Sequence, residues 1–264
     1  MKIELSALSD VGLKRENNED SILLWDLKEQ GEMADGGALT CSLDSNPCLL
    51  VVSDGMGGET AGQVASRTAV SSLSEFASSS FKTKLLDDPE KLVNWLVKGV
   101  EHVNRTVVKK SQQDASLKGM GATLTVAAAI PGRLLIAHVG DSRLYHLRDG
   151  RIRQLTVDHT FVQRLVAMGQ VSAAEAKEHA QRHLLVQAIG SGKDLEIDRL
   201  AAPLSAGDRV MLCSDGLYDL VAGETIVGIL STNASPLDQC RNLVEAAKQA
   251  GGDDNISVIV AHVG

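Results

Sequence analysis

Two apolar segments of this chain end in the same tripeptide, Ser-Asp-Gly. The first segment reads LLVVSDG and ends at Gly55, and the second reads VMLCSDG and ends at Gly216. A short apolar run bounded by a turn signal is typical of a buried strand, and Asp-Gly is a common turn. The chain is therefore expected to carry two core strands that each place one carboxylate, Asp54 or Asp215, at a strand end.

The order of the remaining elements favours an α+β fold. The predicted elements are strands at 2–9, 21–27 and 49–53, helices at 61–77 and 89–110, a strand meander over 123–155, short helices at 161–168 and after a Ser172 cap, a strand at 208–216, a helix at 237–249 and a strand at 255–263. Because the strands cluster, layered α+β architecture is favoured over a doubly wound parallel sheet. A length of 264 residues suits one large domain or two small ones.

The composition disfavours several classes of partner. Only 3% of residues are aromatic and the formal net charge is −8, so nucleic acids and anionic membranes are poor partners. No apolar stretch is long enough to span a membrane, and the start MKIELSALSD lacks the apolar region of a signal peptide. Cys41 and Cys48 could pair, but without an export signal a cytoplasmic protein with reduced thiols is expected.

Acidic residues stand at the ends of several predicted strands. They are Glu19 and Asp20 in NNEDS, Asp54 in VSDGMGG, Asp141 in HVGDSR, Asp215 and Asp219 in CSDGLYD, and Asp253 and Asp254 in GGDDNIS. Any one of them is explained by a turn or a helix cap. As a set they would meet at one sheet edge, where buried carboxylates repel one another unless cations bind. Oxygen ligands without a His/Cys cluster indicate Mg²⁺ or Mn²⁺.

Glycines and one arginine complete the predicted site. Gly55, Gly57 and Gly58 let the backbone approach closely, and the Gly55 carbonyl could face an ion. An acidic pocket neutralised by two divalent ions would attract a phosphate. Arg15 is either the bidentate ligand of that phosphate or an ordinary surface charge.

In this order, the motifs resemble the PPM family of metal-dependent serine/threonine protein phosphatases, also called type 2C. The resemblance covers nearly the whole chain and rests on SDVGLKRENNEDS, VVSDGMGGETAGQVAS, GMGATLTVAAAI, LIAHVGDSRLYHLRDGRIRQLTVDHT, VMLCSDGLYDLV and GGDDNISVIVAHV. DGMGG and DHTFVQRLVAMGQVSAAEAKEH are similar to the bacterial branch. The resemblance implies an α-β-β-α sandwich of two antiparallel sheets flanked by helices, a single domain over 1–264 and a mobile flap at about 159–185.

The resemblance also implies a binuclear Mg²⁺/Mn²⁺ centre. Asp54 would bridge both ions, and Asp215 and Asp254 would complete the protein ligands of the first ion. Glu19 and the carbonyl of Gly55 would serve the second ion, largely through water.

Four further residues receive implied roles. Asp20 would orient a water on the ions, Arg15 would clamp the phosphate, and Asp141 with Asp219 would hold a weaker third ion. The acid directly before Asn255 in the family pattern is Asp254, which leaves Asp253 without a clear role.

The implied reaction is hydrolysis of phosphoserine and phosphothreonine in proteins. A hydroxide formed from water at the two ions would attack phosphorus in line, without a covalent intermediate. The alternative is a catalytically silent scaffold or regulatory binding protein, but such a relative would be expected to lose ligands such as Asp54.

The expected setting is bacterial signal transduction, with a cytoplasmic monomer acting on phosphorylated proteins, a serine/threonine kinase and its substrates. The sequence does not distinguish this from a role inside a larger regulatory or secretion apparatus.

Two features keep alternatives open. Met56 stands where many eukaryotic members carry a histidine, so the leaving oxygen must be protonated by water or by another group. His159 is either that group or a structural residue at the base of the flap. Residues 28–47 form either a partner surface or a disordered insertion.

Overall fold

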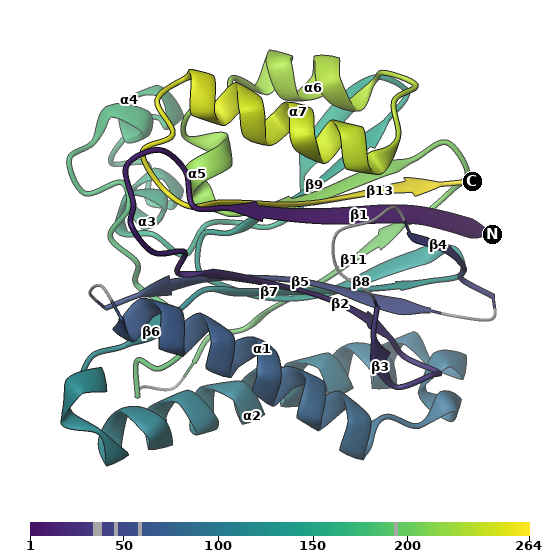
Figure 1. Cartoon of the computed structure of the whole chain (residues 1–264), viewed down its shortest axis with the longest axis horizontal. Helices are drawn as coiled ribbons and strands as arrows, with labels where there is room; N and C mark the ends of the chain where they lie inside the picture. The colour runs from purple at the N-terminus through teal and green to yellow at the C-terminus, as the bar shows by residue number, and fades with distance from the viewer. Residues whose placement is uncertain (34–38, 45–46, 58–59, 193–194) are drawn as a thin grey trace.

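The protein is an α-β-β-α sandwich in which two antiparallel sheets pack face to face between two layers of helices (Figure 1). The computed structural model describes residues 1–33, 39–44, 47–57, 60–192 and 195–264. The predicted fold class is confirmed by this arrangement.

The first sheet has the strand order β10-β9-β12-β13-β1-β4. Its strands are β1 (Lys2–Asp10), β4 (Leu39–Ser42), β9 (Arg143–Arg148), β10 (Arg151–Gln154), β12 (Arg209–Cys213) and β13 (Ile256–Val263). The two ends of the chain pair with each other, because β1 and β13 are antiparallel with Asp10 opposite Ile256. The end of β12, the end of β1 and the start of β13 therefore lie at one edge.

The second sheet has the order β11-β8-β7-β5-β2-β3, with β6 paired to β5. Its strands are β2 (Asp20–Asp26), β3 (Gly31–Glu32), β5 (Cys48–Met56), β6 (Gly121–Ala122), β7 (Leu124–Ile130), β8 (Arg133–Val139) and β11 (Asp198–Pro203). The register places Asp20 directly opposite Asp54. The start of β2 and the ends of β5 and β8 reach the same end of the sandwich as those of the first sheet (Figure 1).

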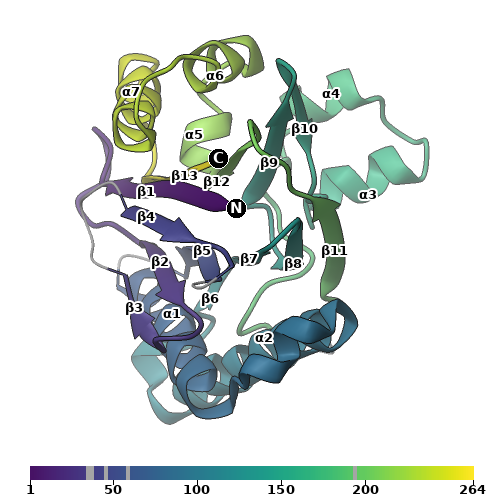
Figure 2. The ribbon, with the colours of Figure 1, turned by 90° about the vertical axis from the view of Figure 1, so that its right-hand side faces the viewer.

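Helices cover the outer face of each sheet (Figure 1). Below the second sheet lie α1 (Ala61–Ser80) and α2 (Pro89–Gln113), and above the first sheet lie α5 (Asp215–Tyr218), α6 (Gly223–Leu230) and α7 (Pro236–Gln249). Two short helices, α3 (Phe161–Ala167) and α4 (Ala173–Glu178), lie beside the sheets near β10 and β11 (Figure 2). The 3₁₀ turns are η1 (Thr83–Asp87) and η2 (Ala115–Leu117).

The alternation of side chains along β5 explains why one apolar run serves two cores. Leu49 and Val51 pack against α1 and α2, whereas Leu50 and Val52 pack between the sheets. All four are 0% exposed, and full burial of such a side chain contributes about 1.5–3 kcal/mol. This strand is therefore anchored from both faces, which fixes the position of Asp54 at its end.

Several elements differ from the sequence-based expectations. Residues 28–47 were expected to be either a partner surface or a disordered insertion, but two strands form in the described part of this segment: β3 pairs with β2 in the second sheet and β4 pairs with β1 in the first. This segment therefore crosses between the sheets, and its residues 34–38 and 45–46 lie outside the described part. Strand β11 and helices α5 and α6 were not predicted. The Ser172 cap is confirmed by a capping box with Glu175.

Candidate metal centre

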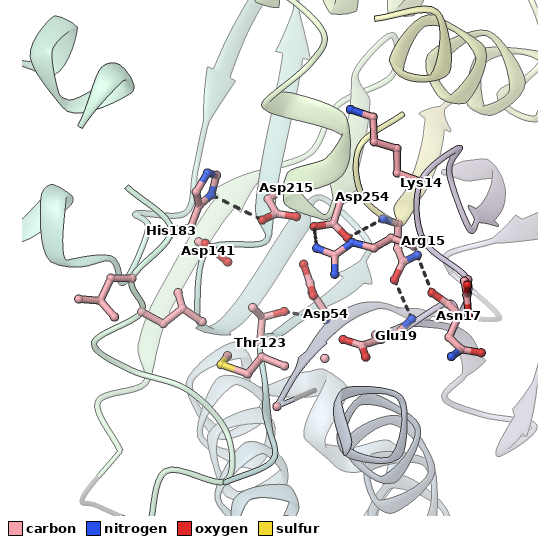
Figure 3. Close-up of a pocket in the computed structure, with 17 residues that line it drawn as sticks. Lys14, Arg15, Asn17, Glu19, Asp54, Thr123, Asp141, His183, Asp215 and Asp254 are labelled. Atoms are coloured by element: carbon pink, nitrogen blue, oxygen red, sulfur yellow. Dashed lines mark hydrogen bonds and ion pairs between the residues drawn. The ribbon is translucent and has the colours of Figure 1, made fainter. Parts of the chain in front are cut away.

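One end of the sandwich contains a cavity of about 790 Å³ whose walls are rich in carboxylates (Figure 3). Eight of the predicted site residues line it: Arg15, Glu19, Asp54, Gly55, Gly57, Asp141, Asp215 and Asp254. They come from both sheets, and they meet because the strands that carry them begin or end at this end of the sandwich. The predicted convergence of the acids is thus observed.

Three predicted acids lie outside the wall of this cavity. Asp20 is 8% exposed and accepts a hydrogen bond from Ser214 Oγ at 2.7 Å. Asp219 lies four residues after Asp215, and its Oδ2 is 3.5 Å from Nδ1 of His183, which lines the cavity. Asp253 points to the surface and pairs with Lys14 at 2.6 Å, so the structure separates it from the cluster.

The carboxylates carry strongly shifted pKa values because they are buried together. Burial, with the charges of Asp20 and Asp215, raises the pKa of Asp54 well above its usual range. Burial raises the pKa of Asp215 to about 6, and Asp254 and Asp219 add to the shift while a hydrogen bond with Asp54 opposes it. Burial raises the pKa of Asp20 to about 7, against the hydrogen bond from Ser214.

These acids form a donor set that suits hard divalent cations. The cavity wall offers carboxylate oxygens from Glu19, Asp54, Asp141, Asp215 and Asp254, and it includes no cysteine among the described residues. Mg²⁺ and Mn²⁺ prefer such ligands, and their charge would favour the ionised forms that burial disfavours. The site residues therefore fit a Mg²⁺ or Mn²⁺ centre.

Glycines allow the chain to pack tightly around Glu19. A Cβ atom on Gly55 would lie 2.1 Å from the carbonyl oxygen of Gly62 and 2.8 Å from that of Glu19. A Cβ atom on Gly62 would lie 2.5 Å from Glu19 Oε2. The close approach expected at Gly55 is therefore made with the first turn of α1 and with Glu19. Gly58 lies outside the described residues.

Asn255 holds the loop that carries Arg15 and Glu19. Its Oδ1 accepts a hydrogen bond from the backbone N–H of Glu19 at 2.8 Å, and its Nδ2 donates to the carbonyls of Val11 and Asn17 at 3.0 and 2.9 Å. The side chain is almost completely buried. The sequence reasoning missed this role, although the position of Asn255 directly after Asp254 was a usable signal.

A second polar network contacts the backbone of Asp141. Tyr218 donates its hydroxyl hydrogen to the backbone carbonyl of Asp141 at 3.0 Å. The guanidinium of Arg143 lies 3.6 Å from the centre of the Tyr218 ring and also forms a forked pair with Asp158, with Nε···Oδ1 3.0 Å and Nη2···Oδ2 2.6 Å. This network also escaped the sequence reasoning, and its only signal was a charged residue within the strand RLYHLR.

The predicted flap leaves and rejoins the sandwich at one point. An isolated bridge pairs Thr160 with Leu185, and Phe161 N donates to Leu184 O at 2.8 Å. From its returning arm, His183, Leu184 and Leu185 line the cavity.

His159 has the contacts of a structural residue. Its Nδ1 accepts from the backbone N–H of Gly140 at 3.3 Å, and its Nε2 lies 3.3 Å from Asp198 Oδ2. It is not among the described residues that line the cavity. These contacts favour the structural alternative over the role of general acid.

Together, the two packed sheets and the acidic cavity at one end define a class of hydrolase that binds divalent cations through oxygen ligands. Comparison with known proteins identifies the family. The family model for protein phosphatase 2C matches residues 28–249. The chain belongs to the protein phosphatase 2C family of serine/threonine protein phosphatases, as its motifs predicted.

Individual relatives agree with this assignment. The serine/threonine phosphatase stp of Listeria welshimeri is 35% identical over 226 residues, which cover 86% of this chain and 88% of the relative. The serine/threonine phosphatase of S. agalactiae superposes with a TM-score of 0.87 at 31% identity, covering 99% of this chain and 100% of that one. The catalytic domain of the phosphatase PstP, solved in complex with two manganese ions, has a TM-score of 0.79 at 34% identity and covers 100% of both chains.

Two further findings concern membrane-spanning helices and the state of the cysteines. Within the described residues, no helix combines the length and hydrophobicity needed to cross a bilayer. All four cysteines, Cys41, Cys48, Cys213 and Cys240, are free thiols.

Proposed function

We propose that the acidic cavity hydrolyses phosphoserine and phosphothreonine esters in proteins with the help of two Mg²⁺ or Mn²⁺ ions. The observation that carries this proposal is the meeting of Asp54, Asp215 and Asp254 with Arg15 in one cavity. The relative PstP, which was solved with two manganese ions, supports it at 34% identity.

Asp54 is proposed as the ligand shared by both ions, because it stands near the end of β5, where the charges of Asp215, Asp141 and Asp254 all act on it. Asp215 and Asp254 would complete one ion site, and Glu19 with the Gly55 carbonyl would serve the other. When bound, the ions would lower the pKa of a coordinated water and offset negative charge on the phosphoryl group.

The remaining residues would position water and substrate. Asp20 lies opposite Asp54 in the register of β2 and β5, and its carboxylate would orient a water at the ions. Arg15 uses Nη2 to bind Asp254 at 2.7 Å while 52% of its side chain remains exposed. Its guanidinium can therefore reach a phosphate at the cavity mouth.

Asp141 and Asp219 would together hold a further ion, which would bind more weakly than the other two.

The domain assignment is also a proposal. Residues 1–264 would form one catalytic domain, since β1 and β13 join its two ends, with residues 159–185 as a flap over the cavity. The bridge between Thr160 and Leu185 supports these flap limits. We further propose that the protein acts as a cytoplasmic monomer in bacterial signal transduction, on substrates of a serine/threonine kinase.

Phosphate release from a phosphothreonine peptide tests the proposed function. The protein is stripped with EDTA, dialysed, and assayed with increasing Mn²⁺ or Mg²⁺ beside the variant Asp54→Asn. We expect no turnover without metal, recovery with either ion, and a loss in the variant of at least about 100-fold, because charge stabilisation and nucleophile formation both depend on the ions. A folded, metal-loaded wild type without phosphatase activity would favour the silent scaffold.

A further inference from the structure

A histidine from the flap joins two of the acids at the rim of the metal centre. His183 Nδ1 lies 3.5 Å from Asp219 Oδ2 and 3.9 Å from Asp215 Oδ2. One ligand atom from each residue lies within 4.8 Å of the other two. The two acids come from the short helix α5 and the residue that follows it, whereas His183 comes from the returning arm of the flap.

A fourth side chain faces the same place. Asp141 is only 5% exposed, lines the same cavity as His183, and lies near Asp215, whose charge acts on it (Figure 3). Its carboxylate is hydrogen-bonded to its own backbone N–H, and the negative charge of Asp215 acts on it. A buried carboxylate beside a second carboxylate is costly, so a cation bound here would stabilise both.

The spacing of these atoms matches the coordination shell of a single ion. Ligand atoms about 2 Å from an octahedral cation lie about 3 to 4 Å from one another. The distances of 3.5 and 3.9 Å from His183 to the two acids fall in this interval. A small approach of each side chain would therefore bring all three ligand atoms into contact with one ion.

We propose that His183 supplies a nitrogen ligand to a divalent cation that Asp215 and Asp219 also bind and that Asp141 faces. This inference rests on the proposed metal centre and adds to it a ligand from the flap. The sequence indicated a weaker third ion near Asp141 and Asp219 but gave no sign of a histidine there.

Two consequences follow from a nitrogen ligand at this position. Imidazole suits transition metals better than Mg²⁺, so the site should prefer Mn²⁺ over Mg²⁺. The ion would also hold the flap, because His183 is followed directly by Leu184 and Leu185 in the cavity wall. Metal binding at the rim and flap position are then linked, and each should stabilise the other.

The chain offers a matched control in the same flap. His179 is four residues before His183, and its ring centre lies 6.4 Å from that of Phe161. It does not belong to the group of ligand atoms formed by His183, Asp215 and Asp219. His183 is exposed, whereas His179 is half-buried and its Nδ1 accepts a hydrogen bond from the backbone N–H of Gln181 at 3.1 Å. Thermal unfolding of each glutamine variant would verify that the fold is intact.

Pulsed electron paramagnetic resonance of bound Mn²⁺ tests the inference directly, since ¹⁴N modulation reports an imidazole nitrogen bound to the ion. The metal-stripped wild type, His183→Gln and His179→Gln are each loaded with Mn²⁺ to saturation. We expect ¹⁴N modulation in the wild type and in His179→Gln, and its loss in His183→Gln. Calorimetric titration should show the weakest Mn²⁺ site of His183→Gln weakened about tenfold or more, since even outer-sphere changes cost that much.

Absence of ¹⁴N modulation from the saturated wild type, or its persistence in His183→Gln, would overturn the inference. These results are separate from failure of the proposed function. If two Mn²⁺ ions bind through oxygen and phosphopeptide hydrolysis proceeds without ¹⁴N modulation, only the assignment of His183 is wrong. If no Mn²⁺ binds, the metal centre itself is wrong.

Discussion

The guanidinium of Arg15 donates a hydrogen bond to the carboxylate of Asp254 at 2.7 Å, although 239 positions separate the two residues. They meet because Arg15 follows β1, Asp254 precedes β13, and these two strands pair along their length. The proposed phosphate ligand and a proposed metal ligand are thus held by one pair of strands. Binding of a cation to Asp254 would leave Arg15 free to turn toward a phosphate.

Replacement of Arg15 by alanine should mainly weaken substrate binding. A charge-assisted hydrogen bond contributes about 1.5–3 kcal/mol, which predicts a loss of about 10- to 100-fold in kcat/KM for a phosphothreonine peptide. Steady-state kinetics at saturating Mn²⁺ would measure this, with Arg105→Ala on the exposed face of α2 as the matched control. Unchanged kcat and KM in Arg15→Ala would rule out the phosphate clamp.

The Asn255→Asp variant should destabilise the loop that precedes β2. The new carboxylate would face the carbonyls of Val11 and Asn17, which accept from the Asn255 amide at 3.0 and 2.9 Å. Loss of buried hydrogen bonds of this kind costs about 1–3 kcal/mol, which a urea titration can measure as a lower free energy of unfolding. Asn94→Asp is the control, because Asn94 is exposed and only accepts a bond from Arg199. Equal stability of both variants would show that Asn255 does not hold this loop.

Tyr218→Phe should raise the Mn²⁺ concentration needed for activity. The change removes the hydrogen bond to the carbonyl of Asp141 but keeps the ring beneath Arg143. One such bond is worth about 0.5–1.5 kcal/mol, so a shift of several-fold in the half-saturating Mn²⁺ concentration is expected. Tyr145→Phe serves as the control, since the Tyr145 hydroxyl contacts the same guanidinium at 3.2 Å. If the two variants require the same Mn²⁺ concentration, Tyr218 does not position Asp141.

Metal-free protein should lose stability as pH rises from about 4 to 7. Asp20 and Asp215 have folded-state pKa values of about 7 and about 6, above their ordinary value of 3.8. In this interval the folded protein binds more protons than the unfolded chain, so the free energy of unfolding falls with increasing pH. Divalent cations bind the ionised carboxylates, so Mn²⁺ should raise the melting temperature more at pH 7 than at pH 5. Thermal unfolding in EDTA and in Mn²⁺ would show this, and a metal-free stability that rises over this interval would contradict it.

The sequence predicted the fold class and most of the acids for one physical reason. Buried strands have strong local signals, and residues such as Asp54 and Asp215 are tied to the strand ends that those signals define. Once the family pattern indicated how the strands pair, the meeting of the acids followed. The central strands and the two long helices were therefore found close to their actual positions.

Contacts between side chains could not be predicted in the same way. The stacking of Arg143 on Tyr218 and the approach of His183 to Asp219 depend on rotamers and on the path of the flap. No local pattern encodes such pairs, since their members lie 36 or more positions apart. The crossing of residues 28–47 between sheets was missed for a related reason, because short edge strands with few apolar residues give little periodic signal.

Anomalous diffraction at the manganese absorption edge tests the central claim most directly. Crystals of metal-stripped protein soaked in Mn²⁺ should show at least two strong peaks in the cavity, both in contact with the carboxylate of Asp54 and one of them also with Asp215 and Asp254. Crystals of Asp54→Asn should lose at least one of these peaks. A cavity without manganese at saturating concentration, or peaks that do not touch Asp54, would contradict the account.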